Sequence, residues 1–270
     1  MAQGSAGGRV TGIRRPVSRR QAVLSGLAIW AVFFAVWEGV AQSGLVNDLL
    51  VPPPSQVIAT LVELLFERDF GSDIAISVGR IAVSFALACA VAVPLGVLMG
   101  SFPAVEAVAN PFVSAWRYLP APSFIPVLLM WFGTGEGPKL ALLVLGVVWF
   151  LITLIMDHTK QVRTELIETA MTLGAGRWVI LRTVILPAVM PNVLVAMRQM
   201  LAVSWTYLVI AEIVASTTGI GAMMMRARRF LETDEIMSGI VVIGFLGLGF
   251  DFLFRMLHRW LFPYLRGREG

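Results

Sequence analysis

The chain has 270 residues, of which 57% are hydrophobic and 14% are charged, with a formal net charge of +4 and a mean hydropathy of +0.81. Soluble domains are about 45–50% apolar and about 25% charged, so these values exclude a soluble globular domain. The single cysteine, Cys89, excludes an intrachain disulfide and a cysteine-based metal site. The apolar residues form blocks near the ~20 residues that cross a bilayer as a helix, and we expect an all-α polytopic membrane protein.

The N-terminal part is expected to be a tail followed by one span. Residues 1–20 are rich in Gly, Ser and Arg, which is typical of a disordered basic tail on the cytoplasmic side. Residues 21–42 then form an apolar run that is long for a signal peptide and contains Glu38, so we predict an uncleaved first span. After Pro52-Pro53-Pro54, Ser55 is predicted to cap an amphipathic helix that lies at the outer interface.

The next two blocks differ in their prolines and glycines. Residues 74–100 are predicted to form the second span, with a kink at Pro94 and a close helix approach at Gly96 and Gly100. Residues 105–132 are interrupted by four prolines, at positions 111, 120, 122 and 126. Broken backbone at membrane depth survives only where protein or water satisfies it. We therefore expect this third block inside the bundle, near any pathway that crosses it.

Three further spans bring the total to about six. They are predicted at residues 139–156, 188–215 and 236–257, which gives a transmembrane domain over residues 21–262 and a cytoplasmic tail over residues 263–270. Counting from an inside N-terminus places residues 157–187 and the C-terminus on the cytoplasmic side. Both are rich in Lys and Arg, as the positive-inside rule requires.

Residues 164–187 form a polar segment between two apolar blocks. Thr164 is predicted to cap a short helix, with Glu165 and Glu168 in its first turns, where the helix dipole favours acid. Gly174 and Gly176 are predicted to end that helix before a second, amphipathic stretch. This polar segment is therefore predicted to be an interfacial helix-turn-helix that acts as a docking surface.

The order of residues in the polar segment resembles the EAA signature of ABC importer membrane subunits. The resemblance is carried by Glu168-Thr169-Ala170, Gly174 and Leu186-Pro187, with Thr169 in place of an alanine. Other segments are similar to the nitrate, sulfonate, taurine and bicarbonate branch of that family: Pro52-Pro53-Pro54-Ser55-Gln56-Val57, Ser77-Val78-Gly79-Arg80, Ile125-Pro126, Trp131-Phe132-Gly133, Gly135-Glu136 and Gly219-Ile220-Gly221.

The resemblance implies a type I ABC importer fold with a cytoplasmic coupling helix. It implies a second copy of the chain, separate ATPase subunits that hold ATP and Mg²⁺, a substrate-binding protein, and no cofactor on this chain. The residues expected to couple to the ATPase are Glu168, Thr169, Ala170, Gly174, Ala175, Leu186 and Pro187.

Charged and polar residues inside spans are candidates for the translocation pathway, because an ionisable group is costly in lipid. The candidates are Arg80, Arg198, Ser204, Trp205, Tyr207 and Glu212. Each has a structural alternative. The arginines can snorkel or pair with Glu212 or Asp251, and the cluster of residues 204–207 can serve helix packing instead of a gate.

The predicted function is that of a permease subunit in the inner membrane, which moves a small anion inward by alternating access. The chain is not expected to be an enzyme, since it has no paired carboxylates and no His-Glu-x-x-His or Gly-x-Ser-x-Gly pattern. A secondary transporter without an ATPase is the alternative. That scheme predicts internal repeats and gives the polar segment no role.

Overall fold

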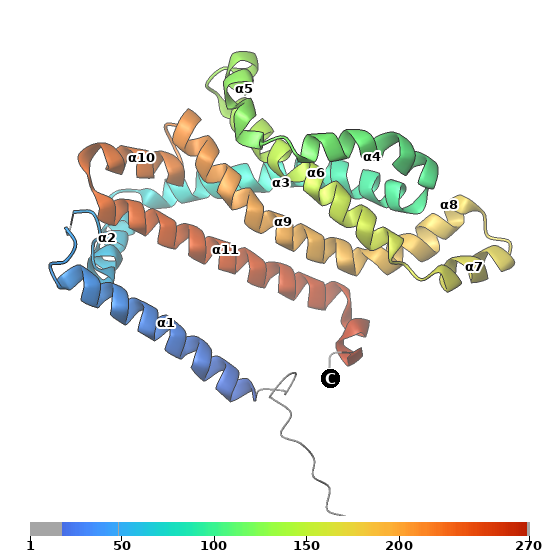
Figure 1. Ribbon diagram of the computed structural model, residues 1–270, viewed down its shortest axis with the longest axis horizontal. Helices are drawn as coiled ribbons and strands as arrows, with labels where there is room; N and C mark the ends of the chain where they lie inside the picture. Colours follow the sequence, from blue (N-terminus) through green and yellow to red (C-terminus); the bar gives the residue numbers. More distant parts are fainter. Residues whose placement is uncertain (1–17, 48, 269–270) are drawn as a thin grey trace, which may run out of the picture. The chain divides into compact units, whose positions relative to one another are not determined.

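The computed structural model describes residues 18–47 and 49–268, and every regular element within them is a helix. The chain divides into a unit that ends at Gln56 and a unit that begins at Val57. The predicted disordered tail falls mostly outside the described residues, and its last two residues, 19 and 20, already belong to the first helix. The helices are α1 (Arg19–Gln42), α2 (Pro54–Glu67), α3 (Phe70–Ser101), α4 (Pro103–Arg117), η1 (Ala121–Phe124), α5 (Ile125–Phe132), α6 (Glu136–Lys160), α7 (Thr164–Thr172), α8 (Arg177–Ile180), η2 (Leu181–Ile185), α9 (Leu186–Ala215), α10 (Ile220–Phe230), α11 (Thr233–Leu261) and η3 (Pro263–Arg268) (Figure 1).

Five helical stretches in the described residues are long and apolar enough to cross a membrane. They lie at Arg20–Gln42, Phe70–Ser101, Glu136–Lys160, Arg177–Ala215 and Thr233–Leu261. A shorter apolar stretch, Ala121–Phe132, corresponds to the end of the predicted third block. The prediction of an all-α polytopic membrane protein with about six spans is therefore confirmed, with one span short and broken.

The first unit contains α1 and the proline-rich segment after it. Ser18 caps α1 in a capping box with Gln21, and the indole Nε1 of Trp37 donates to the carbonyl of Pro52 over 3.1 Å. The prediction that Ser55 caps the next helix is wrong. That helix begins at Pro54, whose fixed φ suits a first helical position, and the Ser55 hydroxyl donates to Glu38 Oε1 over 2.7 Å.

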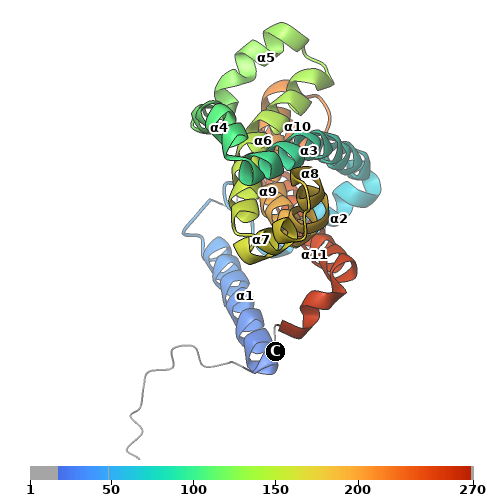
Figure 2. The same ribbon diagram turned by 90° about the vertical axis from the view of Figure 1, so that its right-hand side faces the viewer.

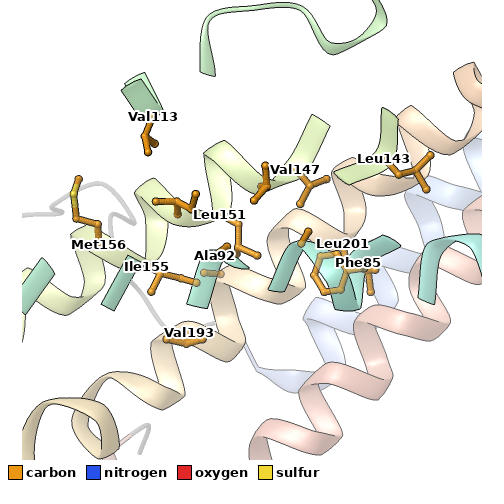
Figure 3. Packing of buried hydrophobic residues seen from close by; sticks show 14 of the residues in the cluster. Phe85, Ala92, Val113, Leu143, Val147, Leu151, Ile155, Met156, Val193 and Leu201 are labelled. Atoms are coloured by element: carbon orange, nitrogen blue, oxygen red, sulfur yellow. The ribbon is translucent and has the colours of Figure 1, made fainter. Parts of the chain in front are cut away.

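The core of the second unit lies where α3, α6 and α9 pack together (Figure 1). A Cβ atom added at Gly96 would lie 2.8 Å from the carbonyl oxygen of Ile152, and one at Gly100 would lie 2.5 Å from Thr159 Cβ. The predicted close approach at these glycines is confirmed, and its partner is α6. Figure 3 shows the apolar side chains that fill the space between these helices, including Phe85, Ala92, Leu143, Val147, Leu151, Ile155, Val193 and Leu201.

The third block lies on the flank of the second unit, as α4, η1 and α5 (Figure 2). The prediction that it lies inside the bundle is wrong for the single chain, because its buried residues are only Val113, Ala121 and Leu128. Met130 is 83% exposed and Trp131 is 72% exposed. Pro111 lies inside α4, but the prolines at 120, 122 and 126 lie where η1 and α5 begin, and these pieces of four and eight residues bury one residue each.

The junction of α3 and α4 lies at the same end of the unit as the end of α6. Lys160 Nζ pairs with Glu106 Oε1 over 2.5 Å, which joins the first turn of α4 to the last turn of α6. The polar segment follows α6 directly. The opposite end of the unit holds the start of α3, the start of α6, the end of α9 and all of α10, as the contacts described below show.

Candidate functional site

The polar segment projects from the second unit as the exposed helix α7, none of whose residues is buried. Thr164 is the first helical residue, and Arg163 stands at the N-cap without a side-chain cap, so the predicted cap at Thr164 is wrong. Hydrogen bonds from its own backbone N–H and from Arg163 hold the pKa of Glu165 below its ordinary value. Glu168 is exposed and makes no ion pair with any described residue.

The C-terminal end of α7 explains why Ala170 and Gly174 stand four residues apart. The Ala175 N–H donates to the Ala170 carbonyl over 3.0 Å, and the Gly174 N–H donates to the Met171 carbonyl over 2.9 Å. These two bonds form a Schellman motif, in which the residue after the cap adopts a left-handed conformation. Gly174 has φ +79°, a conformation that costs glycine little. The predicted helix end is confirmed.

A groove of about 520 Å³ lies between α7 and the following helices. Its walls come from α7, the residue after it, η2 and the start of α9: Leu166, Thr169, Ala170, Leu173, Thr183, Val184, Pro187 and Ala188. Three predicted coupling residues, Thr169, Ala170 and Pro187, thus lie in one groove. Glu168, Gly174 and Leu186 are exposed and Ala175 is half-buried beside it.

The second arm of the polar segment continues into the membrane span. α8, η2 and α9 form one continuous helical stretch, Arg177–Ala215, of 39 residues. η2 is a π-helix that ends just before Leu186-Pro187. Pro187 has no N–H to donate to the preceding turn, and π turns within α-helices frequently occur at functional sites.

At the opposite end of the unit, Arg80 forms the centre of a buried ion cluster. Its guanidinium makes a two-bond pair with Glu136, at 2.7 Å for each bond, and donates to Glu212 Oε1 over 2.7 Å. It also donates to the carbonyl oxygen of Thr218 over 2.8 Å, and Lys139 Nζ completes the group through Glu136 over 2.8 Å. We call these residues the Arg80 cluster. It contains two cations and two carboxylates and is therefore neutral.

The Arg80 cluster also holds the loop that leads into α10. Three consecutive backbone N–H groups, of Gly219, Ile220 and Gly221, donate to Asp73, Ser77 and Glu212 over 2.6, 2.9 and 2.8 Å. Gly219 has φ +101°, and a Cβ atom there would collide with the Glu212 carboxylate. Glu212 of the cluster, together with Asp73 and Ser77, therefore satisfies the N-terminus of α10.

The predicted pathway residues fall into two groups. Arg80 and Glu212 meet in the Arg80 cluster with side chains 3% and 0% exposed, as the structural alternative anticipated for this arginine. Ser204 and Trp205 are buried within the single chain, and the Tyr207 ring packs against Gly146 of α6. Arg198 lies apart from them, 3.4 Å from Asp251 of α11, with its side chain 33% exposed. Their role in transport stays a prediction.

Sequence reasoning assigned no role to Asp73, Glu136 or Thr218. Their neighbourhood in the sequence was nevertheless informative. Each lies in or near a segment that resembles the family: Ser77–Arg80, Gly135-Glu136 or Gly219–Gly221. The structure brings these three distant segments together at one point.

The fold and the site define a polytopic helical membrane protein with an exposed helix, α7, between two of its spans. Residues 92–267 match the family described as binding-protein-dependent transport system inner membrane component. The chain belongs to this family of ABC transporter permeases.

Individual proteins agree with the family match. The taurine transport system permease protein TauC of Escherichia coli (strain K12) is 34% identical over 256 residues, which cover 93% of this chain and 92% of TauC. The putative aliphatic sulfonates transport permease protein SsuC of Bacillus subtilis (strain 168) is 30% identical, with 95% and 93% covered. Among solved structures, an inward-facing MetNI methionine ABC transporter superposes with a TM-score of 0.62 at 20% identity, over 68% of this chain and 91% of that chain. This likeness shows the fold.

Proposed function

We propose that this chain is the permease subunit of an ATP-driven importer for a small sulfonate or a related oxyanion. In this proposal two copies form the membrane part, a separate binding protein delivers the substrate, and ATP and Mg²⁺ bind only to ATPase subunits. Both chain termini and α7 face the cytoplasm. The substrate class is supported by TauC and SsuC, whose names specify taurine and aliphatic sulfonates.

The observation that carries the proposal is the groove beside α7. None of the residues of α7 is buried, so packing within the single chain does not explain why this helix projects from the bundle. A Schellman motif ends the helix at a defined residue. The second arm of the polar segment continues as one helical stretch into the span that contains Glu212. An ATPase surface that fills the groove would therefore contact the start of α9 directly.

The proposed mechanism follows from that connection. When two ATPase subunits close on ATP, they push both copies of α7, and the attached spans rock between outward-open and inward-open states. Glu168, exposed and without an ion partner among the described residues, is available for a cationic or hydrogen-bonding group of the ATPase. The chain itself transmits motion and breaks no bond.

Co-purification of the ATPase tests the proposal. Glu168→Lys reverses the exposed charge, and Gly174→Asp adds a side chain and a negative charge at the φ +79° position. Each is expected to reduce the ATPase recovered with the permease by about tenfold, the change that corresponds to about 1.4 kcal/mol. Glu67→Lys is the matched control, because Glu67 is an exposed carboxylate at the end of α2.

The result depends on a comparison between the variants. Glu67→Lys is expected to retain the ATPase at the wild-type ratio. If Glu168→Lys and Gly174→Asp also retain it, with unchanged substrate-stimulated hydrolysis, the coupling role of α7 is refuted.

A further inference from the structure

The membrane span α9 carries an exposed polar stripe. Asn192, Gln199 and Thr206 stand seven residues apart, which is close to two helical turns, so they share one face. All three are exposed in the single chain. The stripe extends for about 21 Å along the helix, out of the ~30 Å of a bilayer core.

Lipid chains cannot form hydrogen bonds with the polar side chains on this face. Buried amide and hydroxyl groups without partners are costly; in membrane helices the side chains of Asn, Gln and Thr hydrogen-bond to other helices, and ionisable side chains face the bundle interior or a water-filled cavity. The stripe must therefore be covered by water in a passage or by another helix. The charge beside it favours the first.

Arg198 precedes Gln199 in α9 and belongs to a charged triad. It lies about 100° around the helix from the stripe, on the side that faces Asp251 of α11. Its Nε lies 3.4 Å from Asp251 Oδ1, and the same carboxylate pairs with Arg255, one turn further along α11. Two guanidinium groups thus share one carboxylate, which leaves the triad with one excess positive charge. The side chains of Arg198 and Arg255 are 33% and 55% exposed.

The Arg80 cluster provides the contrast. There two cations face two carboxylates, and the side chains of Arg80, Lys139 and Glu212 are 3%, 5% and 0% exposed, so its charges are balanced and only Glu136, at 55%, reaches solvent. The triad is unbalanced and open. On the same flank of α9, two turns from Arg198, Trp205 is buried and its indole Nε1 has no acceptor among the described residues. An anion bound near Arg198 and Arg255 would balance the excess charge of the triad.

We propose that Asn192, Gln199 and Thr206 line a water-filled passage, and that the triad of Arg198, Asp251 and Arg255 is a station for a small oxyanion within it. Guanidinium groups bind planar or tetrahedral oxyanions through paired hydrogen bonds. This inference rests on the proposed import function and assigns its substrate a place. The anion is the transported sulfonate, and a lipid headgroup is the other source of the same chemistry.

Cysteine accessibility tests the passage. In a Cys89→Ala background, the full-length chain carries Gln199→Cys or Thr206→Cys, and the control Leu248→Cys is made on α11, where Leu248 is 64% exposed and apolar. Membranes are treated with anionic and cationic methanethiosulfonates of similar size. Q199C and T206C are expected to react at least about tenfold faster than L248C, because thiols ionise and react in water. Equal rates at the three positions would show that another helix covers the stripe, and would overturn the proposal.

The charge of the reagent tests the triad. At Q199C, after correction for free cysteine, the anionic reagent is expected to react roughly tenfold faster than the cationic one, since an unbalanced charge concentrates counter-ions in a cleft. Arg198→Gln should abolish this preference and Arg198→Lys should restore it. A preference that is absent, or that survives Arg198→Gln, would remove the triad from the proposal.

Added taurine separates the two sources of anion. It is expected to slow the labelling of Q199C in vesicles of neutral phosphatidylcholine as well as in native membranes. If taurine has no effect and the charge preference depends on anionic lipid, the triad binds headgroups and the substrate assignment is wrong. Labelling reports on this chain alone, whereas the import function is tested through ATPase recovery, so either can fail while the other stands.

Discussion

Replacing Arg80 with glutamine tests whether the Arg80 cluster holds the fold together. The substitution removes five hydrogen bonds, two of them to Glu136, one to Glu212 and two to Thr218. Removing one partner of a buried ion pair costs about 3–5 kcal/mol. Glu212 is 0% exposed but keeps bonds from Ser77 and from the Gly221 N–H, and Glu136 is half-exposed to solvent. We therefore expect the lower end, about 3 kcal/mol, or roughly a 100-fold change in the folding equilibrium.

The assay is reversible unfolding of the purified chain in mixed micelles, with Arg163→Gln as the matched control. Arg163 pairs with Glu165 over 3.3 Å, and both side chains are about 70% exposed (72% and 69%), so its loss should cost less than about 1 kcal/mol. The double variant Arg80→Gln/Glu212→Gln should recover part of the loss, because it leaves no buried charge unpaired. If Arg80→Gln costs no more than Arg163→Gln, the cluster is not a structural element, and the reasoning from burial is refuted.

Other predictions concern the glycines. Gly100→Val should destabilise the chain by about 1–3 kcal/mol, because even a Cβ lies 2.5 Å from Thr159 Cβ, while Gly79→Ala, with nothing within 4 Å, should be neutral or stabilising in the same unfolding assay. Gly174→Ala should expose the turn after α7 to proteolysis more than Gly174→Asn does, since asparagine tolerates the left-handed conformation better; equal cleavage of the two would contradict the Schellman end. Gly219→Ala should lower stability as Arg80→Gln does, because its Cβ meets the Glu212 carboxylate, and an unchanged unfolding midpoint would contradict it.

The sequence was sufficient for features that depend on local composition. Blocks of apolar residues predicted the long spans, and Gly174 predicted the end of α7, because helix ends are set by a few neighbouring residues. Gly96 and Gly100 predicted a close approach but not its partner, α6, because contact partners depend on tertiary packing.

Features that depend on distant parts of the chain were not predictable in the same way. The prolines correctly indicated a broken third block, although Pro111 lies inside α4, and their number does not determine whether the pieces lie inside or on the flank. Likewise, Arg80 and Arg198 looked alike as charged residues inside apolar runs. Only the structure separates them, because one meets two carboxylates in a charge-balanced, largely buried cluster and the other shares one carboxylate with a second arginine.

The pathway candidates show the same limit at the level of a helix face. Ser204 and Trp205 were chosen because they are polar or aromatic within a span, and both are buried in the single chain. Asn192 and Gln199 were not among the pathway candidates, although the sequence shows that they share a seven-residue spacing with Thr206. Periodicity identifies a face, but which face is left open depends on where α6 and α11 pack.

The uninterrupted stretch from Arg177 to Ala215 behaves mechanically as a lever. At 1.5 Å per residue its 39 residues are about 58 Å long, so a tilt of about 5° at one end moves the other by about 5 Å. The regular α-helical hydrogen bonding is interrupted at the π turn beside Pro187, which lies close to the end that borders the groove. A small rotation imposed there would be transmitted to Glu212, and through it to the loop before α10, along one helix that contains Pro191.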